Sequence, residues 1–178
     1  MKIIFARHGQ TDYNVEERVC GISRAVLTDV GKQQARALGE KLKEKDVDII
    51  ICSPLQRAVD TAKLANETLN KEIIIDDRFT EWDYGSYEGI KLKDVFDEFQ
   101  KAKLQFGVRL GGGESVMELS HRVFCAIDDI RKRYSDKTIL IVCHGGICRV
   151  AKMYFEDMTM NDFEHFFMEN GEIIEYFL

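Results

Sequence analysis

Four short polar segments of this 178-residue chain contain the residue types that could do chemistry. The first includes Arg7-His8-Gly9, which ends an apolar run that begins at Ile3. A cation and an imidazole beside a glycine can form a site for an anion, with a nucleophile or a base at its centre. The four segments are 7–11 (RHGQT), 52–58 (CSPLQRA), 80–85 (TEWDYG) and 142–146 (VCHGG).

Each segment follows an apolar run rich in β-branched residues, which predicts a buried strand. The predicted strands cover 2–6, 47–52, 73–75, 138–143 and 173–178. Helical patterns occupy 28–43, 55–69, a stretch that begins at 115, and 145–155. This alternation predicts an α/β fold, a three-layer α/β/α sandwich with a mostly parallel central sheet. Because ligands bind beyond the carboxyl ends of such strands, we expect the four segments to meet at one edge of the sheet.

The composition limits the class of protein. The length fits a single domain over residues 1–178, and 45% hydrophobic with 31% charged residues is typical of a soluble globular protein. A net charge of −6 argues against nucleic acid or an anionic membrane as the main partner. The five cysteines form no CxxC pair, which favours buried free thiols. No apolar stretch is long enough for a membrane span or a signal peptide, so we expect a cytoplasmic protein.

The four segments, in this order and spacing, resemble the histidine phosphatase superfamily, the phosphoglycerate mutase-like proteins, over nearly the whole chain. The length and motifs look like the phosphatase branch that includes α-ribazole phosphatases and broad-specificity phosphomonoesterases. The resemblance implies a phosphoglycerate mutase-like fold. It also implies a metal-independent phosphomonoester hydrolase of the histidine acid phosphatase type, which needs no cofactor and acts on a small phosphorylated metabolite.

The resemblance assigns five catalytic positions. His8 matches the nucleophile that forms a phosphohistidine, with a nearby carbonyl fixing its tautomer. Arg7 and Arg57 match the clamp on the phosphoryl oxygens, where a planar guanidinium binds with two donors. His144 matches a further donor. Glu81 matches the proton donor to the leaving alkoxide, a role for which Asp83 and Glu88 of the same loop are rivals.

The resemblance also suggests positions that bind the substrate. The residues expected there are Thr11, Asn14, Gly21, Ile22, Arg24, Tyr84 and Gly145. Gly145 opens a helix whose amide groups would face the anion. Arg24 stands where many relatives have an acidic residue, so it either contacts a second negative group or is an ordinary surface arginine.

Three alternatives stay open. Residues 143–149 satisfy C-x-x-G-x-x-R, the phosphate loop of cysteine-dependent phosphatases, which would make Cys143 the nucleophile. The second alternative is a mutase-type phosphotransferase. Residues 77–114 are expected to cover the active site, and they contain only one short helix between Gly89 and Gly107. That short cover favours hydrolysis. The third is a non-catalytic phosphate-binding protein. The sequence leaves the oligomeric state open, a homodimer included.

Overall fold

The computed structural model describes residues 1–178, and its centre is one five-stranded sheet. The strand order is β3-β2-β4-β1-β5. The first four strands run parallel, and β5 pairs antiparallel with β1 at one edge. The strands are β1 (Lys2–Arg7), β2 (Ile49–Cys52), β3 (Glu72–Ile75), β4 (Thr138–Cys143) and β5 (Ile173–Phe177). The predicted α/β fold with a mostly parallel sheet is confirmed.

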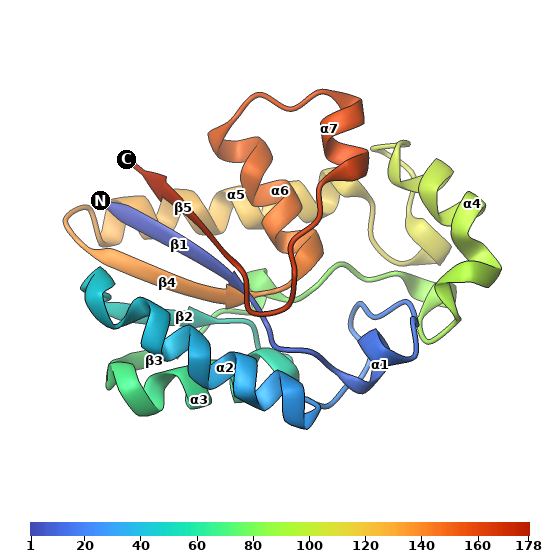
Figure 1. The fold of residues 1–178 in the computed structure, drawn as a ribbon. Helices are drawn as coiled ribbons and strands as arrows, with labels where there is room; N and C mark the ends of the chain where they lie inside the picture. The colour runs from blue at the N-terminus through green and yellow to red at the C-terminus, as the bar shows by residue number, and fades with distance from the viewer.

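Seven α-helices surround the sheet: α1 (Asp12–Val15), α2 (Asp29–Leu42), α3 (Gln56–Leu69), α4 (Leu92–Lys103), α5 (Val116–Arg133), α6 (Gly145–Phe155) and α7 (Met160–His165). Single turns of 3-10 helix occupy Lys43–Lys45, Asp77–Phe79, Gly85–Tyr87 and Leu110–Gly112. Helices α2 and α3 lie on one face of the sheet, and α5 and α6 lie on the other (Figure 1). None of these helices combines the length and the apolar character that crossing a membrane requires.

Side chains of the central strands alternate between two apolar cores, one on each face of the sheet. Ile3 and Phe5 of β1 pack with residues of α5 and α6, whereas Ile4 and Ala6 pack with residues of α2 and α3. All four side chains are fully buried. This burial on both faces explains why the strand sequences are continuously apolar.

Capping residues place the helix starts that position the site. The Thr28 side chain accepts a hydrogen bond from the amide of Gly31 at the start of α2. Ser115 and Glu118 form a reciprocal capping box at the start of α5. Both caps agree with the sequence, because a hydroxyl at the N-cap satisfies an otherwise unpaired helical amide.

The carboxyl ends of β1, β2 and β4 reach the same edge of the sheet. Arg7 is in register with Cys143, and the His8 amide donates to the Cys143 carbonyl at 3.0 Å. The Ser53 amide donates to the Val142 carbonyl at 3.1 Å. Helices α1 and α4 lie beyond this edge, where a ligand would approach (Figure 1). Three of the four polar segments therefore begin side by side.

Candidate active site

His8 is buried just beyond the end of β1 with a defined hydrogen-bonding pattern. Its Nδ1 lies 2.7 Å from the Gly9 carbonyl oxygen, which can only accept, so Nδ1 carries the proton. Its Nε2 therefore has a lone pair, and it accepts a hydrogen bond from Arg57 Nε at 3.2 Å. Burial, with the charges of Arg57 and Arg7 adding to it, lowers the pKa of His8 well below the ordinary value. The imidazole is thus neutral, and Nε2, which accepts from Arg57 here, is the one ring nitrogen with a lone pair for attack.

Gly9 is required by a close approach between two backbones. A Cβ at this position would lie 2.3 Å from the Gly31 carbonyl oxygen in the first turn of α2. The Gly9 amide donates to Thr61 Oγ1 of α3 at 3.1 Å. The segment that presents His8 is therefore fixed against both helices on that face of the sheet.

Two arginines flank His8. Arg57 is only 1% exposed, and besides His8 it donates to the carbonyls of Ser23 at 3.0 Å and Gly21 at 2.6 Å. Arg7 donates through Nη1 to the Met168 carbonyl, and its Nε is buried without a partner. An unpaired buried guanidinium nitrogen is costly unless a ligand completes its hydrogen bonding.

His144 follows β4 and faces His8, with 5.1 Å between the ring centroids. Its Nε2 lies 2.7 Å from Ser53 Oγ, and its Nδ1 is buried with no partner. If the hydroxyl of Ser53 donates to Nε2, then Nδ1 carries a proton that can be donated to an anion. Burial, followed by the charge of Arg57, lowers the pKa of His144 well below its ordinary value.

Glu81 reaches the same site from the loop after β3. Its Oε2 accepts from the Gly146 amide at 3.0 Å, and its Oε1 accepts from the Trp82 amide at 2.8 Å. A Cβ on Gly146 would lie 2.5 Å from Glu81 Oε1, so the glycine makes room for the carboxylate. Of the rival carboxylates, Asp83 accepts from the Gly85 amide, and Glu88 accepts from amides of the loop at 21–24. Glu81 is the carboxylate of this loop that lines a cavity beside His8, which is described below.

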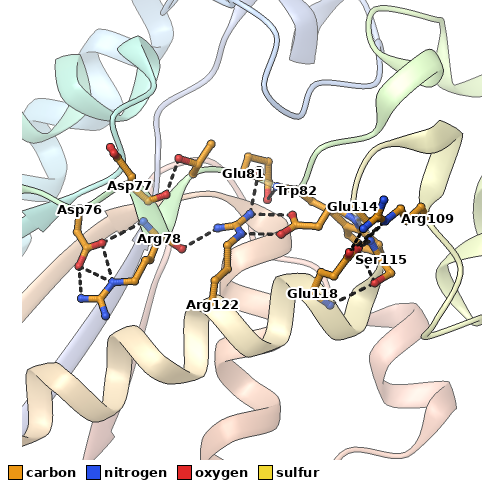
Figure 2. A network of polar contacts seen from close by, with 11 residues as sticks. Asp76, Asp77, Arg78, Glu81, Trp82, Arg109, Glu114, Ser115, Glu118 and Arg122 are labelled. Atoms are coloured by element: carbon orange, nitrogen blue, oxygen red, sulfur yellow. Dashed lines mark hydrogen bonds and ion pairs between the residues drawn. The ribbon is translucent and has the colours of Figure 1, made fainter.

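Arg122 of α5 holds the Glu81 loop, as Figure 2 shows. It donates through Nη1 to the Arg78 carbonyl at 2.6 Å and through Nη2 to the Glu81 carbonyl at 3.2 Å. The Glu114 carboxylate accepts from Nε and Nη2 of Arg122 at 2.7 and 2.9 Å. Sequence reasoning missed this residue, because an arginine within a helical pattern gives no signal of a loop that follows a distant strand.

Thr11 and Asn14 cap the short helix α1. The Thr11 side chain accepts from the Asn14 amide, and Asn14 Oδ1 accepts from the Thr11 amide at 3.0 Å. Asn14 lines the cavity, whereas Thr11 is fully buried behind it. The Asn170 amide nitrogen donates to the His8 carbonyl at 3.0 Å and also reaches Asn14.

The loop at 21–24 supports Arg57. The amides of Gly21 and Ile22 both donate to the Glu88 carboxylate at 3.1 Å, so they are not free for a ligand. Gly21 contributes its carbonyl to Arg57. Arg24 is exposed and lies outside the lining of the cavity. Glu88, named in the sequence only as a rival acid, is therefore a structural acceptor that orders this loop.

A cavity of about 520 Å³ opens beside His8. The predicted site residues that line it are Arg7, His8, Asn14, Glu81, Tyr84 and Gly145. Arg57 and His144 lie buried behind these residues, where they contact His8. Most of the remaining lining comes from residues 13–20, from α4 and from the segment after α7.

Cys143 does not present a nucleophile to this cavity. Its Sγ is fully buried, 3.6 Å from Cys148 Sγ, and it is not among the lining residues. Burial raises the pKa of Cys143 well above that of an ordinary thiol. Because a reactive cysteine needs a lowered pKa and access to solvent, the geometry does not favour the cysteine-dependent alternative.

The arrangement is suited to holding a tetrahedral anion beside a neutral imidazole, with a carboxyl group nearby to transfer a proton. Comparisons with known proteins agree. An acid phosphatase of Mycobacterium tuberculosis is 32% identical over 174 residues, which are 97% of this chain and 84% of that protein. A probable phosphoglycerate mutase of an Enterobacter species is 35% identical, covering 82% of this chain and 70% of that protein.

The structure of an α-ribazole phosphatase from Shigella flexneri superposes with a TM-score of 0.83 at 26% identity, covering 98% of this chain and 89% of that chain. The sequence profile of branch 1 of the histidine phosphatase superfamily matches residues 3–176. The chain belongs to the histidine phosphatase superfamily.

Proposed function

We propose that the protein is a metal-independent phosphomonoester hydrolase that acts through a phosphohistidine at His8. The observation that carries the proposal is the hydrogen-bonding state of His8. Its Nδ1–H is fixed on the Gly9 carbonyl, and its Nε2 lone pair meets a guanidinium donor at the end of the cavity. The lowered pKa keeps the imidazole neutral and nucleophilic at physiological pH and below it.

The reaction has two steps. In the first, His8 Nε2 forms a bond to phosphorus while the bond to the leaving oxygen breaks, and Glu81 donates a proton to that oxygen. In the second, Glu81 takes a proton from water, the water oxygen bonds to phosphorus, and the phosphorus–nitrogen bond breaks. Such general acid and base catalysis contributes roughly 10²–10⁴-fold.

We expect four groups to hold the negative charge of the phosphoryl group. These are Arg7 with its unpaired Nε, Arg57, the buried Nδ1 of His144 and the amide of Gly145 at the start of α6. Preformed donors stabilise the charge without the reorganisation that water would need. Asn14 and Tyr84 line the same cavity and contact the substrate, together with the segment 77–114 as a cover.

Hydrolysis is favoured over transfer to a second substrate. The helix α4 that borders the cavity is only 12 residues long, and the cavity beside His8 is not enclosed. Water therefore reaches the phosphohistidine. The relative named as a probable phosphoglycerate mutase is the observation that supports the transferase alternative. The expected substrate is a small phosphorylated metabolite.

The test is hydrolysis of an aryl phosphate in the presence of EDTA by the wild type, His8→Asn and Cys143→Ser. Activity that persists in EDTA and in Cys143→Ser, and is lost in His8→Asn, is the expected result. Loss in Cys143→Ser with retention in His8→Asn would contradict the proposal. If the wild type is inactive on aryl phosphates, transfer of label between positions of a phosphoglycerate would indicate the mutase instead.

A further inference from the structure

The cavity extends from the phosphate-binding end toward two cations that the proposed reaction does not use. Lys103 ends α4, and Arg149 lies one turn into α6. Both line the cavity. In the sequence, Arg149 completes the cysteine-phosphatase pattern, which the geometry does not favour.

Lys103 is a buried cation without an anionic partner. It is 6% exposed and forms no hydrogen bond and no ion pair. Its Nζ lies 5.4 Å from the centroid of the Phe99 ring. Burial, together with the charge of Arg149, lowers the pKa of Lys103 to about 8, and Glu164 only partly opposes this shift. The Nζ atom is not among the fully buried unpaired atoms, so the ammonium group reaches the cavity. A largely desolvated cation that faces a cavity without a partner favours an anion from outside the chain.

Arg149 is also incompletely satisfied. Its Nη2 donates to the Phe166 carbonyl at 2.7 Å, while its Nε is buried with no partner. The guanidinium carbon lies 5.5 Å from the centroid of the Phe163 ring, and the side chain forms no ion pair. The charges of Glu81 and Arg7 act on Arg149, and the charge of Arg149 acts on Lys103, so Arg149 lies between the His8 end and Lys103. Neither cation forms an ion pair, so together they can bind one anionic group.

The rest of the lining fits a short apolar linker. Leu92, Phe96, Phe99 and Phe166 contribute to the wall of the cavity. Its charged lining consists of five cations, Arg7, Arg18, Lys93, Lys103 and Arg149, against two carboxylates, Glu17 and Glu81. This excess is notable in a chain whose net charge is −6.

We propose that the substrate carries a second anionic group, a carboxylate or another phosphate, which binds between Lys103 and Arg149 while the first phosphoryl group lies at His8. The inference rests on the proposed function, because it assumes that the reacting phosphoryl group occupies the His8 end. The substrate class is therefore a phosphomonoester with an anionic tail, joined to the ester by an apolar segment.

The experiment uses straight-chain alkyl phosphates from propyl to hexyl. Each is compared with the same chain ending in a carboxylate and with the same chain ending in a second phosphate. The readout is the ratio of kcat/KM for the anionic compound to kcat/KM for its neutral counterpart. For at least one chain length, the wild type should favour the anionic compound by roughly tenfold or more, since one charge-assisted hydrogen bond is worth that much. Whichever anionic series shows the preference identifies the second group.

Lys103→Met keeps the apolar stem beside Phe99 and removes the charge, so this ratio should fall toward one. Lys103→Arg should retain part of the preference. The matched control is Lys101→Met, at an exposed position of the same helical turn, which should keep the ratio of the wild type. The melting temperature of Lys103→Met without ligand should be equal to or above that of the wild type, because a largely desolvated charge without a partner is removed. A drop in melting temperature with an unchanged ratio would mean a structural role and would overturn the inference.

Binding provides a readout that does not depend on turnover. Calorimetry of the same compounds with the His8→Asn protein should show the same preference for the anionic tail. If the wild type hydrolyses every compound with no preference for the anionic tail, the inference is overturned and the proposed function stands. Absence of hydrolysis by the wild type, with a binding preference that Lys103→Met abolishes, supports the anionic subsite and overturns the proposed function.

Discussion

Two buried neutral imidazoles make the folded protein sensitive to acid. His8 and His144 have pKa values well below the ordinary 6.5, chiefly because both are buried. As the pH falls through that value, the unfolded chain takes up a proton at each imidazole while the folded protein does not. The unfolded state then binds more protons, so the stability contributed by these neutral groups is lost as the pH decreases. Between about pH 7.5 and pH 5.5, protonation of each of these imidazoles in the unfolded state lowers the unfolding free energy by about 1.4 kcal/mol.

The substitution His8→Asn isolates one of these contributions, because an asparagine amide can still donate to the Gly9 carbonyl. Urea unfolding of the wild type and the variant gives the difference in their unfolding free energies at each pH. From about pH 7.5 to pH 5.5, that difference should shift by about 1.4 kcal/mol in favour of the variant. The control His121→Asn changes an exposed histidine and should show no such shift. A difference for His8→Asn that stays constant across this range would refute the neutral, buried His8.

Two further substitutions test how the Glu81 carboxylate is positioned. Gly146→Ala adds a methyl group 2.5 Å from Glu81 Oε1, so kcat should fall roughly 10²-fold while the helix is not destabilised; an unchanged kcat would mean that the Gly146 contact is unimportant. Arg122→Gln should lower kcat by roughly tenfold with less effect on KM. Arg122→Lys should restore only part of kcat, because an ammonium group cannot form the planar pair of hydrogen bonds that the guanidinium forms with Glu114. Equal kcat values for the wild type and Arg122→Gln would exclude a positioning role.

The parts of the fold that follow from local patterns could be predicted from the sequence. β4 was predicted with its observed bounds, because a run that is buried on both faces contains only apolar and β-branched residues. Helices α2 and α5 begin where Thr28 and Ser115 indicated. The two short helices α1 and α7 were not predicted, because four and six residues are too few for a helical periodicity to be recognised.

The site residues, too, include some that local sequence patterns predict and others that depend on distant contacts. The segments containing His8, Arg57, Glu81 and His144 were expected to converge, and the structure brings them together, since parallel strands end at one edge. The supporting contacts depend on distant parts of the chain. Arg122 reaches the Glu81 loop across 41 residues, and nothing in its local sequence indicates that reach.

The burial of Lys103 could not be predicted from the sequence either. Lys103 reads as a solvated cation at a helix end, which is a favourable place for a positive charge. Its burial results from the packing of α4 over the cavity, a non-local event. Likewise, Gly21 and Ile22 were expected to bind the substrate, and in the structure their amides donate to the Glu88 carboxylate.

The most direct test of the phosphohistidine at His8 is to trap it. Wild-type protein is mixed with a hydrolysed phosphomonoester and quenched with alkali during turnover, because phosphohistidine is stable in base, and its peptides are then analysed by mass spectrometry. The expected result is the mass of one phosphoryl group on the peptide that contains His8, absent from His8→Asn. Turnover of the wild type with the phosphoryl group on another residue, or with none trapped under conditions that preserve phosphohistidine, would contradict a nucleophilic role for His8.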